Sequence, residues 1–244
     1  MIHSAKRWIV WGLVVSLFPA GMAAAEQLVD VQKRLIELNG QIQSLAARIS
    51  SGSELIDKSG SNKTETVGTL EWMERDGRQL QRTETRTVKT AIIRGKTTTV
   101  EIKQMEVSDG VDAILYQESR GQKTVMKQQP TSRPADPLAT LKEKFDLVLL
   151  PDESIDGQSC WVIEARPRKD VPPTRAGNRS RHFFRKKDGV LAQEIYYDGR
   201  GGVTLTKTYH DIQVNSPIYA GRFTFEPPPD AILYEPEDAK PPPN

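Results

Sequence analysis

The feature that most constrains this chain is a succession of strand-length segments separated by short turn signals. From residue 67 almost to the end, these segments are bounded by pairs such as Asp76-Gly77, Arg120-Gly121 and Asp188-Gly189. Such pairs favour tight turns between antiparallel strands. Strands do not alternate with helices, which argues against a parallel, doubly wound sheet. The expected strands are 67–74, 78–90, 97–107, 113–118, 122–128, 158–166, 181–187, 190–197, 203–214 and 222–225.

Two helices are expected beside these strands. Apolar residues recur at spacings of three and four from Leu28 to Ile49, which taken alone fits a core-packing helix or a three-heptad coiled coil. Asn39-Gly40 is typical of a helix end, so we expect a helix over 27–38 that packs on the core. Residues 42–49 also fit an extended segment. A short helix is predicted over 138–145, after the proline-bounded break at 130–137.

These elements predict a mainly β (α+β) fold. Short turns between many strands imply one large antiparallel sheet, curled into a half-open barrel. The N-terminal helix and the short central helix are expected to cover its concave face. A sandwich of two sheets is the alternative architecture. Residues 51–66 are rich in Ser, Gly, Lys and Thr and are expected to form a loop. No sharp boundary divides the chain, so a single domain over 26–234 is expected.

The two ends of the chain have their own signatures. Lys6 and Arg7 precede an apolar run over 8–18, and small residues end at Ala25, which is the pattern of a cleaved signal peptide over 1–25. The run is shorter than the roughly 20 residues that a membrane-spanning helix needs. We therefore expect export to the periplasm as a soluble protein. Residues 235–244 form an acidic, then proline-rich tail that is expected to fray.

Charge and motif content limit the possible functions. Without residues 1–25 the basic and acidic side chains balance, and this argues against a general nucleic-acid binder, which needs a basic excess. The sequence contains no H-E-x-x-H, G-x-S-x-G, C-x-x-C or G-x-G-x-x-G motif. His182 and His210 fall in different strands and are interpreted as structural. The lone Cys160 is interpreted as a small buried hydrophobe. We expect no enzyme activity, no metal site and no cofactor.

A β-rich shell with helices is the physical form of a carrier of apolar ligands. A curled sheet can shield acyl chains from water, at about 0.8 kcal/mol for each buried methylene. Alternation along the strands identifies side chains that could face the hollow, although the same residues could simply fill the core. These candidates are Leu70, Trp72, Trp161, Ile163, Phe183 and Tyr196.

Several motifs, in order along the chain, resemble the outer-membrane lipoprotein-sorting (LolA-like) family of periplasmic carriers. The C-terminal motif F-x-F-x-P-P begins at Phe223 and is followed by Asp230-Ala231-Ile232. Upstream matches cover nearly all of the chain after the signal peptide. They are the helix after the signal peptide, the strand 68–75, Ser108-Asp109-Gly110 before Ile114-Leu115-Tyr116, Ile155-Asp156-Gly157 before Cys160-Trp161-Val162, the hairpin turn Asp188-Gly189, and Val214-Asn215-Ser216-Pro217-Ile218.

The resemblance implies a half-open barrel with a helical lid, which carries acyl chains of lipoproteins or lipids between an inner-membrane donor and an outer-membrane acceptor. It also implies an arginine that links barrel and lid, for which Arg75 is the nearest match, although Asp76 stands where a proline often follows. A monomer is expected. The alternative function is an envelope-stress sensor or regulatory binding module of the same fold. A hydrolase with a scattered acid pair and a purely structural envelope protein remain as further alternatives.

Overall fold

The computed structural model describes residues 27–57, 60–168 and 179–234. The predicted signal peptide and the predicted C-terminal tail therefore lie outside the described residues. The elements are α1 (Leu28–Asn39), β1 (Ser44–Asp57), β2 (Gly60–Arg75), β3 (Arg78–Ile93), β4 (Lys96–Ser108), β5 (Ala113–Ser119), β6 (Gln122–Gln128), α2 (Ala139–Lys144), β7 (Phe145–Ile155), β8 (Gln158–Pro167), β9 (Ser180–Arg185), β10 (Leu191–Tyr197), β11 (Val203–Val214), the 3-10 turn η1 (Ala220–Phe223) and β12 (Ile232–Tyr234).

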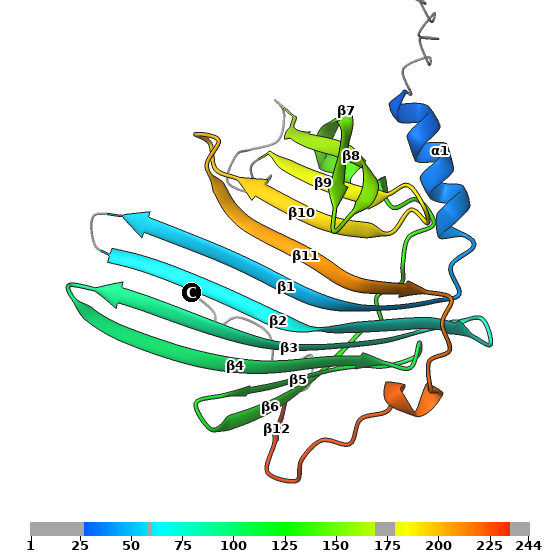
Figure 1. Ribbon diagram of the computed structural model, residues 1–244. Coiled ribbons are helices and arrows are strands. Elements are labelled where there is room, and N and C mark those ends of the chain that lie inside the picture. Colours follow the sequence, from blue (N-terminus) through cyan, green and yellow to red (C-terminus); the bar gives the residue numbers. More distant parts are fainter. Residues whose placement is uncertain (1–26, 58–59, 169–178, 235–244) are drawn as a thin grey trace, which may run out of the picture.

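The strands form one 12-stranded sheet in the order β12-β6-β5-β4-β3-β2-β1-β11-β10-β9-β8-β7. Neighbouring strands are antiparallel, except that β12 runs parallel to β6. The sheet curls so that β7 to β10 rise over β1 to β5 without closing into a barrel (Figure 1). The predicted fold class, a large antiparallel sheet curled into a half-open barrel with two helices, is confirmed.

Tight two-residue turns join β2 to β3, β3 to β4 and β5 to β6. Asp76 and Gly77 between β2 and β3 both have positive φ, at 53° and 72°. The pairs Arg94-Gly95 and Arg120-Gly121 have the same property. Turns with two positive φ values match the right-handed twist of the strands they join, so each one also contributes to the curl of the sheet.

Two local predictions differ from the structure, and two strands were missed. Residues 51–66, expected to form a loop, belong to β1 and β2, which stay paired out to Asp57 opposite Gly60. Their small polar side chains suit strands whose faces are both close to water, and the ladders to β11 and β3 keep them extended. Residues 222–225 were expected to be a strand, but η1 lies there instead, with Phe223 buried. The edge strands β7 and β12 were not predicted.

The two faces of the sheet are covered by different segments. We call the inner face the one that carries Leu45, Leu70, Trp72, Trp161, Phe184 and Tyr209, and the other the outer face. Val31, Leu35 and Leu38 of α1 pack on Trp161 and Phe184 of the inner face, together with Leu138. The segment after β11 crosses the outer face, where the Phe225 ring lies 5.5 Å from that of Tyr116. One end of the inner face is thus roofed by helices.

Candidate binding cavity

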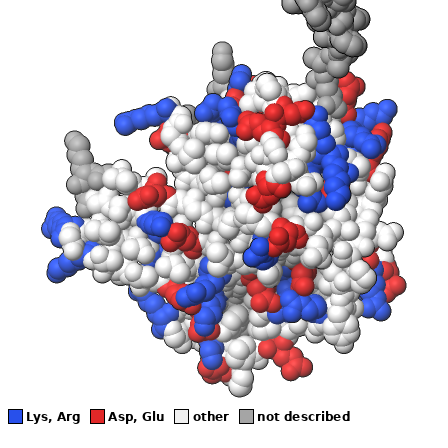
Figure 2. Space-filling view, viewed as in Figure 1, with Lys and Arg blue, Asp and Glu red and all other residues white. Residues whose placement is uncertain are grey.

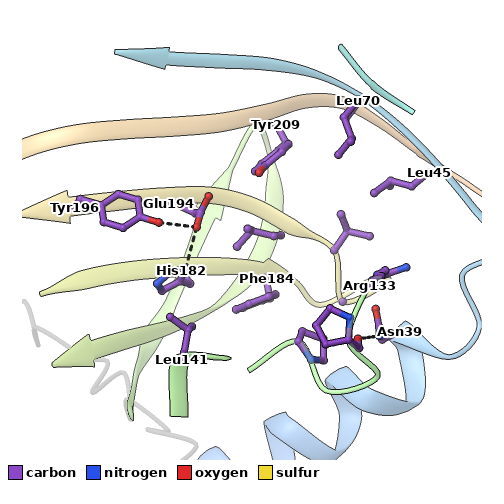
Figure 3. A pocket seen from close by; sticks show the side chains of 16 residues that line it. Asn39, Leu45, Leu70, Arg133, Leu141, His182, Phe184, Glu194, Tyr196 and Tyr209 are labelled. Atoms are coloured by element: carbon purple, nitrogen blue, oxygen red, sulfur yellow. Dashed lines mark hydrogen bonds and ion pairs between the residues drawn. The ribbon is translucent and has the colours of Figure 1, made fainter. Parts of the chain in front are cut away.

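A cavity of about 330 Å³ lies on the inner face beside the helices. Its floor comes from β1, β2, β9, β10 and β11, and its roof from the end of α1, the segment 133–137 and α2 (Figure 3). We call it the apolar chamber. It is lined by Asn39, Leu45, Ala47, Leu70, Arg133, Pro134, Pro137, Leu141, His182, Phe184, Gly189, Val190, Leu191, Glu194, Tyr196 and Tyr209.

A second cavity of about 470 Å³ adjoins the first. The two share Leu45, Leu70, Arg133 and Tyr209, so they lie side by side under the segment that follows β6, and we call the pair the hollow. We call the second cavity the polar chamber, because it is lined in addition by Gln81, Thr83, Glu106, Thr131, Ser132 and Lys207, beside Ile49 and Trp72. The hollow therefore has a strongly apolar end and a more polar end.

Strand alternation explains why these side chains converge. Leu45 and Ala47 of β1 lie opposite Trp72 and Leu70 of β2 in the antiparallel ladder. Residues two apart on a strand point to the same face, so two adjacent strands turn all four side chains inward. On the next strand Tyr209 pairs with Ile49, which continues the same surface.

A hydrogen-bonded group on β9 and β10 borders the apolar chamber. The Glu194 carboxylate accepts a hydrogen bond from the Tyr196 hydroxyl at 3.0 Å and lies 3.4 Å from His182 Nδ1. His182 Nε2 lies 2.9 Å from the Ser180 hydroxyl. Burial pushes the pKa of Glu194 upward, but His182, Tyr196 and Lys207 outweigh it and the net pKa is lowered. Burial, and then the Glu194 charge, raise the pKa of Tyr196.

Arg133 lies where the two chambers meet. Its backbone N–H donates to Gln79 Oε1 at 2.6 Å, and its guanidinium carbon lies 5.2 Å from the centre of the Trp72 ring. Desolvation by burial lowers the pKa of Arg133. The neighbouring loop is tied to α1 by Asn39, whose Nδ2 donates to the Pro134 and Ala135 carbonyls at 2.9 and 3.0 Å. Figure 3 shows Asn39 and Arg133 side by side at one end of the chamber.

Six of the seven residues predicted from sequence fall into three groups. Leu70, Trp72 and Tyr196 line the hollow. Trp161 and Ile163 share the inner face but lie in the core beneath α1. Phe183 packs with Cys160 and Val162 on the outer face.

Arg75, the seventh predicted residue, lies at the end of β2, half exposed, with its Nε 3.5 Å from Asp76 Oδ2. Lipid contact by any of the seven stays a prediction. Sequence reasoning missed Arg133, because its proline-flanked segment signals only a break in the strands. That the segment crosses the inner face depends on contacts with residues far away in the chain.

Other chemistry has little support in the described part of the chain. No cluster of three or more His, Cys, Asp or Glu side chains is placed to hold a metal ion within those residues. The Cys160 thiol is fully buried, and burial raises its pKa, as suits a packing residue rather than a nucleophile. Lys, Arg, Asp and Glu side chains are interspersed over the face seen in Figure 2. None of the described helices is long and apolar enough to span a bilayer.

The fold and the hollow together define a half-open β-barrel with a lidded cavity on its inner face. No protein-family model and no curated protein sequence matches the chain.

Several solved structures are distantly similar to it. An uncharacterized conserved protein from Thermus thermophilus is 11% identical at a TM-score of 0.49, over 85% of this chain and 98% of that one. A putative outer membrane lipoprotein-sorting protein domain from Vibrio parahaemolyticus is 10% identical at a TM-score of 0.33, and the match covers 80% of this chain and 95% of that one. The MucA/MucB complex structure from Pseudomonas aeruginosa is 13% identical at a TM-score of 0.43, and the match covers 81% of this chain and 60% of that one.

Proposed function

We propose that this protein is a non-enzymatic carrier or binder of lipidated proteins or lipids, which shields acyl chains in the apolar chamber. The observation that supports this proposal best is the chamber itself. Its volume of about 330 Å³ lies in the range of ligand pockets, and most of its lining is aliphatic or aromatic. An alkyl chain placed there gains about 0.8 kcal/mol for each methylene removed from water.

The roof of the chamber supplies a route for loading. Segment 133–137 and α2 cover the hollow. Polar contacts that hold them include the two Asn39 bonds, the bond from Gln32 to Asp136, the Gln79 contact with the Arg133 amide, and bonds from Arg168 to the Lys142 and Lys144 carbonyls. A short segment held by a limited set of hydrogen bonds can open locally while the sheet stays folded. In this proposal the lid opens to admit an acyl chain and closes over it. The protein would act in the periplasm after removal of residues 1–25, as a monomeric single domain over 26–234, between a membrane donor and a membrane acceptor.

The first test is native mass spectrometry of the mature protein purified from its own envelope fraction, with organic extraction of bound material. We expect a lipid or an acylated peptide to accompany the protein, and the apo-protein to take up a fluorescent fatty acid. Clean apo-protein that takes up no probe would contradict the carrier function and favour the sensor or structural alternative.

A matched pair of variants on β2 tests the location. Leu70 lines both chambers, whereas Val67 lies on the opposite face and is 57% exposed. Leu70→Glu should lower probe affinity about tenfold or more, because a carboxylate resists burial beside an alkyl chain. Val67→Glu adds the same charge outside the hollow and should bind like the unmodified protein. Equal binding by both variants would place the ligand elsewhere.

A further inference from the structure

Three buried polar atoms lack a hydrogen-bond partner in the described part of the chain. They are Arg133 Nη1, Trp72 Nε1 and Asn39 Oδ1. All three belong to residues that line the hollow. Buried polar atoms without partners are rare in native proteins, and each one calls for an explanation. Two of the three, Arg133 Nη1 and Trp72 Nε1, are donors, and a ligand acceptor in the hollow would supply the partner that they lack.

The charge of Arg133 strengthens this indication. Its guanidinium forms no ion pair with any described residue and instead faces the Trp72 ring. An arginine stays charged in a protein, so burial without a counter-charge is unfavourable. Of the two carboxylates that line the hollow, Glu194 is already engaged by Tyr196 and His182. Glu106 lines the polar chamber, to which Lys207 also contributes a positive charge, and it forms no ion pair with Arg133 among the described residues.

The position of Arg133 sets the orientation of a ligand. Arg133 lines both chambers and so stands where the apolar end meets the more polar end, with its guanidinium carbon 5.2 Å from the centre of the Trp72 ring. A molecule with an alkyl chain in the apolar chamber would place its polar end at this boundary. Arg133 Nη1 and Trp72 Nε1 are both donors, which suits an oxygen acceptor.

We propose that Arg133 and Trp72 bind the acyl head of a fatty-acyl ligand, a carboxylate or an ester carbonyl, whose alkyl chain fills the apolar chamber. The inference rests on the proposed function and adds the head-group chemistry to it. An ionised carboxylate completes an ion pair with Arg133, whereas an ester carbonyl accepts a hydrogen bond without neutralising the charge. We therefore expect the site to bind palmitate more tightly than methyl palmitate, and methyl palmitate more tightly than an alcohol of equal chain length.

The experiment measures displacement of a fluorescent fatty acid by palmitate, methyl palmitate and hexadecanol. The unmodified protein should bind palmitate about tenfold more tightly than hexadecanol, the value of one charge-assisted hydrogen bond. Arg133→Met should abolish that preference and retain hexadecanol binding, whereas Arg133→Lys should keep part of it. Trp72→Phe keeps the ring and removes the N–H, and should weaken palmitate and methyl palmitate alike. The control is Arg48→Met, because Arg48 lies on the outer face, paired with Asp211.

The outcomes separate the two proposals. If Arg133→Met binds all three ligands but still prefers palmitate as the unmodified protein does, the head-group site is wrong and the carrier function stands. If the unmodified protein binds none of them, the carrier function fails and the head-group site fails with it. Retained hexadecanol binding and an unchanged thermal midpoint show that Arg133→Met is folded, so a lost preference then reports on the head group itself.

Discussion

The guanidinium of Arg133 lies over the ring of Trp72, with 5.2 Å from its central carbon to the ring centre. This contact joins the segment after β6 to the floor of the sheet at the boundary between the two chambers. Asn39 joins the same segment to the end of α1. Floor, lid and helix therefore meet within a few side chains of the hollow, and changes to any of them should alter access to it.

Asn39→Ala should loosen the lid without unfolding the sheet. The change removes two hydrogen bonds to the Pro134 and Ala135 carbonyls, each worth about 1 kcal/mol. We expect faster amide hydrogen exchange over 131–140, with little change in β2 and β3. Glu37→Ala is the control, since Glu37 lies on the same helix and, among the described residues, pairs only with the exposed Arg34. Equal exchange in the two variants would show that Asn39 does not hold the lid.

The packing of α1 on the inner face should make a large contribution to stability. Leu35 is fully buried in the cluster with Trp161 and Phe184. Leu35→Ala should cost about 3 kcal/mol, because it leaves a cavity in a close-packed region. The neighbouring Ile36 is 38% exposed, so Ile36→Ala should cost less than about 1 kcal/mol. Urea denaturation measures both, and similar losses would mean that α1 is not docked as described.

The local elements that sequence predicted are those fixed by neighbouring residues. The helix at 27–38 follows from the spacing of its leucines, and the hairpins follow from pairs such as Asp76-Gly77. The extension of β1 and β2 through residues 51–66 was missed because Ser, Gly and Thr have weak strand preference, and pairing with β11 and β3 overrides it. The turn at Phe223 resembled a strand because its aromatic residues alternate, yet they pack on the outer face as irregular chain.

The candidate site was predictable only in part, for the same reason. Alternation along β2 and β10 identified Leu70, Trp72 and Tyr196, which line the hollow. It could not tell the inner from the outer face for Phe183, whose strand is buried on both sides. Arg133 lines the hollow because the segment after β6 crosses the inner face of the sheet. No local sequence pattern predicts that path.

Acidification should weaken the fold partly through Glu194. Its folded-state pKa is lowered, since contacts with His182 and Tyr196 outweigh the opposing effect of burial. A lowered carboxyl pKa contributes stability that is present above the unfolded value of about 4.3 and is lost as pH falls through the folded pKa. Glu164, whose lowered pKa reflects its arginine partners outweighing burial, acts in the same direction.

The comparison of Glu194→Gln with the unmodified protein isolates the contribution of Glu194. The variant should lose less stability than the unmodified protein as pH falls below about 4.3, because Gln has no proton to gain. Unfolding free energies measured across this range check it. If the free energy of unfolding falls equally with pH below about 4.3 in the two proteins, the role assigned to Glu194 is wrong.

Two glycines in neighbouring strands should respond oppositely to the same substitution. A Cβ on Gly68 of β2 would clash with the Glu84 carbonyl oxygen of β3, whereas one on Gly52 of β1 would meet nothing within 4 Å. Gly68→Ala must therefore push two backbones apart in the middle of a ladder and should cost about 2 kcal/mol or more. Gly52→Ala restricts the unfolded chain without a clash and should be neutral or stabilising by up to about 1 kcal/mol. The thermal midpoints of the two variants check this prediction. Equal midpoints would mean that β2 and β3 are not as close at Gly68 as described.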